Sequence, residues 1–221
     1  MLCSLITERL ASSSKQHSST VALVPPETAW APIQKVREEL HDKGLYRWPP
    51  HINLLYPFLP FEDFAAATLL LAPALSSLQA SEITLDSLGC FGGRKNGVLY
   101  AHCSSEQQTA ALIKIQATLQ DALPFLTHQQ RNGIFTPHMT LSHFGSREAA
   151  EAAKEALASN WAPVNFRLDD TIHVLRREGG GGQFERHATL GFCGASLRVY
   201  DPPRRFDSML REEAAWMQQA R

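Results

Sequence analysis

The sequence predicts an α/β (α+β) fold in which two pseudo-symmetric lobes of mainly antiparallel sheet, flanked by helices, surround a central cleft. Three observations predict this architecture. Short β-branched runs alternate with helical stretches along the chain. None of these runs has the continuous apolarity of a strand buried in a parallel sheet. A proline-histidine pattern occurs twice, 87 residues apart and in corresponding surroundings, which indicates two similar halves.

The individual elements follow from periodicity and from the residues that end them. Apolar residues three to four positions apart predict helices, and Pro73 predicts a break in one of them. The expected helices cover residues 27–43, 61–80, 105–123, 147–159 and 206–220. The expected strands, which are rich in β-branched and aromatic residues, cover residues 21–24, 51–54, 83–85, 97–102, 138–141, 164–168, 171–175 and 184–192.

Composition places the chain among folded soluble proteins. Of its 221 residues, 44% are apolar and 19% are charged. The formal net charge of −1 provides no basic field for a long nucleic-acid groove, although a local site can still hold a nucleotide or an RNA end. No apolar run approaches the ~20 residues that span a bilayer. We therefore expect a monomer without a membrane partner.

The cysteines indicate a reducing compartment. They form no CxxC pair and are too sparse for a disulfide scaffold or a zinc knuckle. The four are Cys3, Cys90, Cys103 and Cys193. We expect reduced thiols and a cytoplasmic protein, with the nucleus or an organelle left open.

Domain organisation is predicted from the ends of the chain. Residues 1–19 are rich in serine and are expected to form a flexible tail, with a weak organelle transit peptide as the alternative. Residues 20–197 are expected to form one domain with two lobes. Residues 198–221 are expected to form a surface extension.

The repeated pattern places similar groups at the start of two strands. It reads PPHINLLYPF around His51 and TPHMTLSHF around His138. Proline can begin a strand and keeps the residue before it extended. Because side chains alternate along a strand, His51 and Asn53 share one face, and so do His138 and Thr140. Each strand thus offers an imidazole and a short hydrogen-bonding group to a common cleft.

Two such imidazoles are suited to acid–base chemistry at a phosphodiester. A neutral histidine removes a proton from the attacking oxygen, and a protonated histidine supplies one to the leaving oxygen. Asn53 and Thr140 are candidates to hold the phosphate oxygens on which charge accumulates. The arrangement requires no metal or other cofactor. Our preferred assignment has His138 activate water and His51 protonate the leaving oxygen.

The paired PHINL and PHMTL segments resemble the doubled His-x-(Thr/Ser) signature of the two-histidine (2H) phosphoesterase superfamily, which includes the 2′-5′ RNA ligase-like proteins and cyclic phosphodiesterases. The resemblance covers residues 20–195 and includes the hairpins LDSLGCF…GVLYAHC and NFRLDDTIHVLRR…GGQFERHATLGF. It implies a bilobal fold and metal-independent hydrolysis or transesterification of 2′,3′-cyclic or 2′-5′ bonds at RNA ends or nucleotides. Asn53 departs from the signature, which leaves substrate orientation open.

Other readings of these residues stay open. The alternatives to an enzyme are a non-catalytic module that binds a nucleotide or RNA end and a protein whose histidines bind a metal. Tyr56 and Phe58 are candidates for stacking on a base, with core packing as the alternative. His143 shares its strand parity with Met139 and Leu141, so we expect it to be structural and to point away from the cleft.

Overall fold

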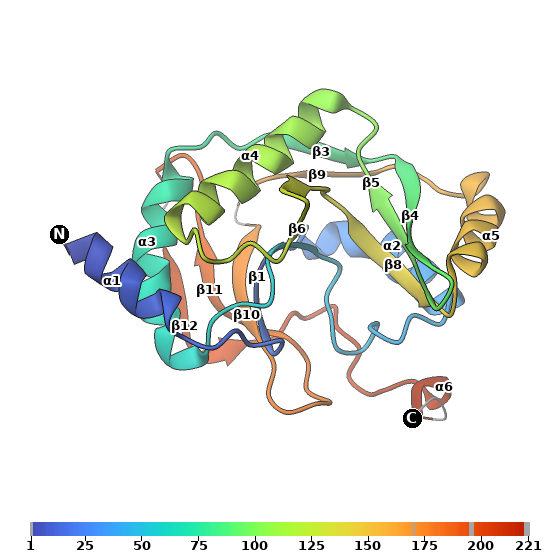
Figure 1. The fold of residues 1–221 in the computed structure, drawn as a ribbon. Coiled ribbons are helices and arrows are strands. Elements are labelled where there is room, and N and C mark those ends of the chain that lie inside the picture. Colours follow the sequence, from blue (N-terminus) through green and yellow to red (C-terminus); the bar gives the residue numbers. More distant parts are fainter. Residues whose placement is uncertain (1, 170, 195–196, 219–221) are drawn as a thin grey trace.

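The computed structural model describes residues 2–169, 171–194 and 197–218 (Figure 1). The helices are α1 (Leu2–Ala11), α2 (Trp30–Glu39), α3 (Phe64–Ser76), α4 (Glu106–Ala122), α5 (Arg147–Ala158) and α6 (Ala215–Gln218). The strands are β1 (Ser19–Leu23), β2 (Ile52–Leu55), β3 (Glu82–Leu85), β4 (Ser87–Gly93), β5 (Asn96–His102), β6 (Gln130–Arg131), β7 (Ile134–Phe135), β8 (Met139–Phe144), β9 (Val164–Arg167), β10 (Ile172–Arg176), β11 (Glu185–Leu190) and β12 (Arg198–Arg204).

Two antiparallel sheets dominate the fold and carry one histidine motif each. A five-stranded sheet has the order β12-β11-β10-β1-β2, and a three-stranded sheet has the order β4-β5-β8. Strands β3 and β9 form one further pair, and β6 and β7 form another. The edge strands β2 and β8 contact each other, so the two motifs meet where the sheets meet.

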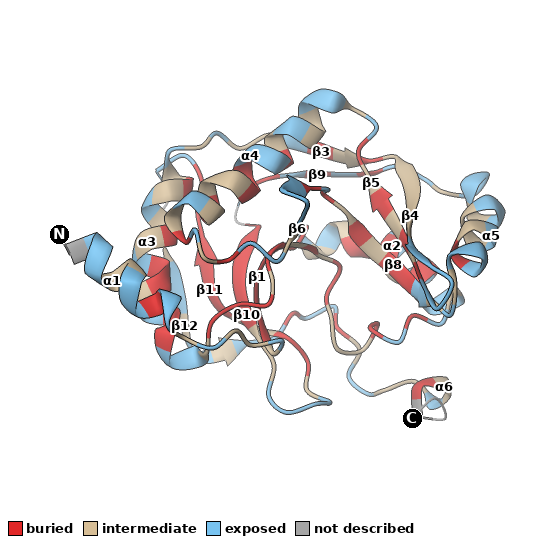
Figure 2. Ribbon diagram, viewed as in Figure 1, coloured by how far each residue is buried: buried red, intermediate tan, exposed pale blue. Residues whose placement is uncertain are grey.

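Helices cover the sheets from several sides. Helix α3 contacts β11 and α4 contacts β2, whereas α5 packs on β4 and β5 and α2 contacts β8 (Figure 1). Buried residues follow the strands, while the outer faces of α4 and α5 are exposed (Figure 2). A second, smaller cluster around Trp30 and Phe206 packs apart from the main core. The predicted α/β architecture with antiparallel sheets is confirmed.

The N-terminal segment differs from the predicted flexible tail. Residues 2–11 form helix α1, which packs on α3 and has Leu10 at 0% exposure. Arg9 Nη2 lies 3.1 Å from Asp63 Oδ1, and the Ser13 hydroxyl donates to Asp63 Oδ2 at 2.5 Å. Burial of an apolar helix face and these polar contacts fix the segment to the domain.

The domain also extends past the predicted C-terminal boundary. Strand β12 pairs with β11 in the five-stranded sheet, so the domain continues beyond residue 197. Phe206 and Met209 pack into the Trp30 cluster, and the predicted helix over 206–220 is restricted to α6 within the described residues. Helix α3 continues through Pro73 without the predicted break. The carbonyl that Pro73 leaves unpaired belongs to Leu69, which is exposed and can be solvated.

Across the part of the chain that is described, no helix combines the length and the apolarity that crossing a membrane would require.

Candidate active site

The two motif histidines stand immediately before the edge strands of the two sheets. His51 precedes β2 and His138 precedes β8. Ile52 and Met139, the next residues, are buried in the main core. Alternation along each strand therefore turns the histidines away from the core, as the sequence predicts.

Both imidazoles are oriented by the same backbone contact. His51 Nδ1 lies 2.8 Å from the carbonyl oxygen of Pro49, and His138 Nδ1 lies 2.8 Å from that of Thr136. A carbonyl can only accept, so Nδ1 carries the hydrogen in each neutral ring. The lone pair is then on Nε2 in both histidines, which is the form that can take up a proton.

The side-chain amide of Asn53 donates a hydrogen bond to the lone pair on His51 Nε2. Its Nδ2 lies 3.1 Å from His51 Nε2 and donates to it, while its Oδ1 accepts from the Thr20 hydroxyl at 2.7 Å. One amide N–H therefore has a protein partner, and the second is left for another acceptor. The Thr140 hydroxyl forms no hydrogen bond to any described residue and lines the same cleft as Asn53.

Burial keeps both histidines neutral. Desolvation lowers the pKa of His51 to about 3; the hydrogen bond to Pro49 opposes this shift, and the charge of Arg37 adds to it. Desolvation also lowers the pKa of His138, against the hydrogen bond to Thr136. The charge on either ring would affect the other, because His138 is among the causes that lower the pKa of His51. A phosphate anion bound between them would favour the charged form.

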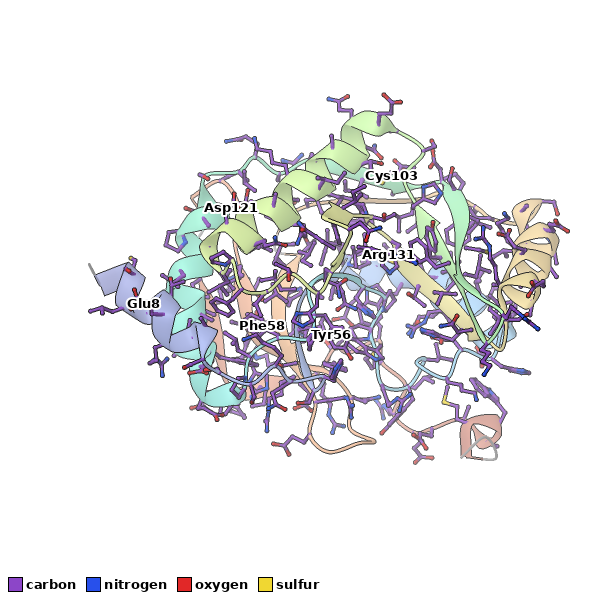
Figure 3. The ribbon with its side chains drawn as sticks, in the orientation of Figure 1. Glu8, Tyr56, Phe58, Cys103, Asp121 and Arg131 are labelled. Carbon is purple, nitrogen blue, oxygen red and sulfur yellow. The ribbon has the colours of Figure 1, made fainter. Side chains whose placement is uncertain are left out.

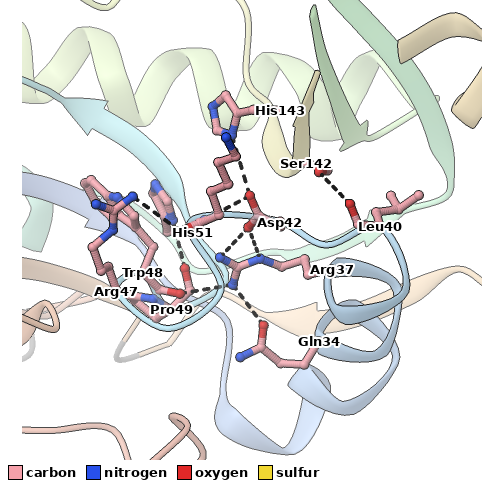
Figure 4. A network of polar contacts seen from close by, with 12 residues as sticks. Gln34, Arg37, Leu40, Asp42, Arg47, Trp48, Pro49, His51, Ser142 and His143 are labelled. Atoms are coloured by element: carbon pink, nitrogen blue, oxygen red, sulfur yellow. Dashed lines mark hydrogen bonds and ion pairs between the residues drawn. The ribbon is translucent and has the colours of Figure 1, made fainter. Parts of the chain in front are cut away.

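A buried ion pair forms the floor beside His51. Arg37 donates to Asp42 Oδ2 from Nε at 2.9 Å and from Nη2 at 2.8 Å, and the Gly44 amide donates to Oδ1 at 3.1 Å. Figure 4 shows Asp42 between Arg37 and His143, whose Nδ1 lies 3.5 Å from Oδ1. Burial alone would raise the pKa of Asp42, but the His143 hydrogen bond and the Arg37 charge outweigh it and lower the pKa.

His143 lies on the cleft face, contrary to the prediction from strand parity. Tyr100 pairs with Thr140 whereas its neighbour Leu99 pairs with Ser142, so β8 carries one extra residue at this point. Such a bulge reverses the alternation beyond it. Ser142 is consequently buried and His143 is exposed in the cleft.

The cleft between the sheets has a volume of about 190 Å³. It joins four of the predicted site residues to other residues of the two sheets, of α2 and of the segment after α2. The lining residues are Arg37, Asp42, Gly44, Trp48, His51, Asn53, Tyr56, Thr140 and His143. His138 is not among them; it stands two residues before Thr140, and its ring centroid lies 5.5 Å from that of Tyr100, the strand partner of Thr140. A larger cavity of about 590 Å³ between α3 and β11–β12 is lined by none of the motif residues.

The two predicted stacking residues have different positions (Figure 3). Tyr56 lines the cleft, and its hydroxyl lies 3.3 Å from His17 Nδ1. Phe58 is 0% exposed and packs against Phe64, so it has no free face for a base and belongs to the core. The Trp48 ring stacks on His51, with ring centroids 4.4 Å apart, and on Phe184, with ring centroids 3.6 Å apart. Trp48 therefore supports the His51 ring by packing against it.

Arg37 could have been found from the sequence. It falls on the apolar stripe of α2 that Trp30 and Ile33 define, and a charge at a buried helical position needs a partner. Asp42, five residues further on, supplies that partner. The role of His143 had no such local signal, because it depends on a bulge in strand pairing.

The sequence also matches a known protein family. The sequence profile of the 2′-5′ RNA ligase superfamily matches residues 25–181, a segment that contains both histidine motifs. The chain belongs to this superfamily. No curated protein sequence matches the chain.

Solved structures show that the fold of this 2′-5′ RNA ligase superfamily member is shared. E. coli LigT in its apo form aligns with a TM-score of 0.54 and 17% identity, over 81% of this chain and 99% of LigT. LigT complexed with 3′-AMP aligns with a TM-score of 0.50 and 16% identity, over 77% and 93%. A crystal structure described as a phosphoesterase aligns with a TM-score of 0.51 and 18% identity, over 84% and 98%.

Proposed function

We propose that the protein is a metal-independent phosphoesterase that hydrolyses 2′,3′-cyclic or 2′-5′ phosphodiester bonds at RNA ends or in nucleotides. The observation that carries this proposal is the matched pair of histidines, each with Nδ1 tied to a backbone carbonyl and Nε2 left as the reactive nitrogen. Membership of the superfamily and the LigT complex with 3′-AMP support it.

The surroundings of the histidines favour His51 as the base and His138 as the acid, which is the reverse of the assignment predicted from sequence. His51 has a pKa lowered to about 3, and the Asn53 amide hydrogen bond also favours its neutral form. His51 is thus neutral in the ligand-free site, and in this assignment it takes the proton of water as the water oxygen bonds to phosphorus. His138 would give a proton to the ribose oxygen as its bond to phosphorus breaks. Thr140 and the second N–H of Asn53 would bind the non-bridging oxygens.

A substrate panel tests this proposal directly. Wild-type protein would be incubated in EDTA with 2′,3′-cyclic nucleotides, 2′-5′ linked dinucleotides and 3′-uridylated RNA, and the products would be identified. Turnover that survives chelation is expected. Turnover that is lost in EDTA and restored by zinc or magnesium would point to another mechanism, and no turnover on any member would refute the proposal.

One observation favours a second candidate, a module that binds nucleotides without turnover. In the ligand-free cleft the Asn53 amide occupies the nitrogen that would act as base. If substrate cannot displace this hydrogen bond, the cleft binds a phosphate but does not activate water. Nucleotide binding without product on the whole panel would distinguish this candidate from the enzyme.

A further inference from the structure

The cavity of about 590 Å³ lies between helix α3 and the outer strands of the five-stranded sheet. Helix α3 packs on β11, and β12 beyond it is the edge strand of the sheet (Figure 1). Small-molecule sites in proteins usually have volumes of about 300–1,000 Å³. The cavity therefore has the size of a small-molecule site.

The cavity and the candidate active site open on opposite faces of this sheet. Ala188 lines the cavity and pairs with Val174, and both side chains belong to the main core. Asn53 lines the cleft and pairs with Ala22, which belongs to the second cluster around Trp30. A ligand in the cavity would therefore leave the motif histidines accessible to substrate.

Exposed apolar side chains are concentrated on the walls of the cavity. Six large apolar side chains are exposed in the described part of the chain, and three of them line this cavity. These are Phe61, Leu69 and Val199, with 52%, 62% and 67% of their surface exposed. Exposed apolar side chains that gather in one place mark a binding site, whereas single scattered ones need no explanation. The walls thus provide room for the apolar part of a ligand.

Two carboxylates are the only charged groups among the described residues that line the cavity. Glu62 stands just before α3 and Asp201 lies in β12, and both are exposed. Neither has an ion-pair or hydrogen-bond partner among the described residues. His187 also lines the cavity, and burial lowers its pKa, so that its imidazole is neutral. The lining therefore has a negative charge without a cation to balance it.

The charges next to the cavity leave this negative charge in place. Arg176 pairs with Glu178 at 3.3 Å, and Glu185 pairs with Arg205 at 2.8 Å, so each pair is neutral as a whole. Arg176 Cζ also lies 5.1 Å from the centroid of the Phe61 ring, which already holds this cation. A cation in the cavity would therefore depend on the two lining carboxylates and not on that ring.

We propose that this cavity binds a small organic cation, a primary amine with an apolar aromatic or aliphatic body. The apolar walls would bind the body, and the exposed carboxylates of Glu62 and Asp201 would bind the ammonium group. A neutral ligand of the same shape would lose the ion pairs, and an anionic ligand would be repelled. The inference goes beyond the proposed function and does not depend on it, because no motif residue lines the cavity.

The test compares three ligands that share one body and differ in charge: 4-phenylbutylamine, 4-phenylbutanol and 4-phenylbutyrate. Binding to the full chain would be followed by NMR titration of the backbone amides. The amine should bind about 2- to 30-fold more tightly than the alcohol, which is the effect of two exposed ion pairs. The carboxylate should bind more weakly than the alcohol. The shifted amides should be those of α3, β11 and β12.

A double variant tests the role of charge. Glu62→Gln combined with Asp201→Asn should lower the affinity for the amine to that for the alcohol, and should leave the affinity for the alcohol unchanged. Glu38→Gln combined with Asp207→Asn is the matched control, because it removes the same two charges from exposed residues outside the cavity. This control should behave as wild type.

A filled cavity tests the location of the site. Ala65 is an exposed lining residue of α3, so Ala65→Trp should abolish binding of both the amine and the alcohol. Ile113→Trp, at an exposed position of α4, is the control and should bind both. Equal affinity for amine and alcohol in wild type, a preference that survives the cavity double variant, or binding that survives Ala65→Trp would overturn the inference. Turnover of cyclic nucleotides in that case would leave the proposed function standing.

Discussion

His173 should make the fold sensitive to acid. It lies in β10 with 5% of its surface exposed, and its Nδ1 is 2.9 Å from the Thr189 hydroxyl oxygen. Burial, with a smaller contribution from the charge of Arg186, lowers its pKa to about 3. The unfolded value is ~6.5. Between these values the unfolded chain binds a proton that the folded protein does not, so stability falls as the pH falls below ~6.5. From about pH 7 to about pH 5, the loss amounts to roughly 2 kcal/mol.

Urea unfolding at the two pH values measures this loss. We expect wild-type protein to lose about 2 kcal/mol more of its unfolding free energy than His173→Gln. The contribution of His51 is present in both proteins and cancels in the comparison. His128→Gln, a change at an exposed histidine, is the control and should follow wild type. The reasoning is refuted if His173→Gln loses as much stability on acidification as wild type.

Three further predictions concern the site. His51→Ala and His138→Ala should each lower turnover about 10²–10⁴-fold, with a double variant less impaired than the product of the two; steady-state kinetics on a cyclic nucleotide checks this. Asn53→Thr removes the amide that donates to His51 Nε2, so it should keep or raise turnover. A loss as large as that of His51→Ala would contradict the proposal that Asn53 only binds a phosphate oxygen. Arg37→Met should lower the free energy of unfolding by about 3–5 kcal/mol, because it leaves Asp42 buried without Arg37. An unfolding free energy close to that of wild type would show that the fold does not need the Arg37–Asp42 pair.

The sequence predicts the motif geometry well because that geometry is local. Proline before each histidine and the two-residue period of a strand are enough to place His51 with Asn53 and His138 with Thr140. The prediction for His143 was wrong because one extra residue between Thr140 and Ser142 reverses the alternation, and this bulge is defined by pairing with β5.

The ends of the domain depended on contacts that no short segment reveals. Strand β12 contains two consecutive prolines, Pro202 and Pro203, which argue against a strand unless it lies at a sheet edge, and β12 is an edge strand. Helix α1 is held by Asp63, which is far away in the sequence. Phe58 lies in an apolar run, and the sequence of that run does not distinguish a fully buried ring, as Phe58 is, from one exposed in the cleft.

Each half of the fold places a histidine in the same way, and the proposed reaction requires the two histidines to differ. Each half holds a histidine at the start of an edge strand with Nδ1 fixed by a carbonyl, so symmetry alone would give two equivalent neutral imidazoles. One must accept a proton and the other must give one. The neighbours supply the difference: Asn53 and Arg37 favour neutral His51, whereas His138 stands against Phe91 and Tyr100. In the proposed reaction, a substrate phosphate bound beside His138 would favour protonation of that ring. Substrate binding would then create the acid that the ligand-free site lacks.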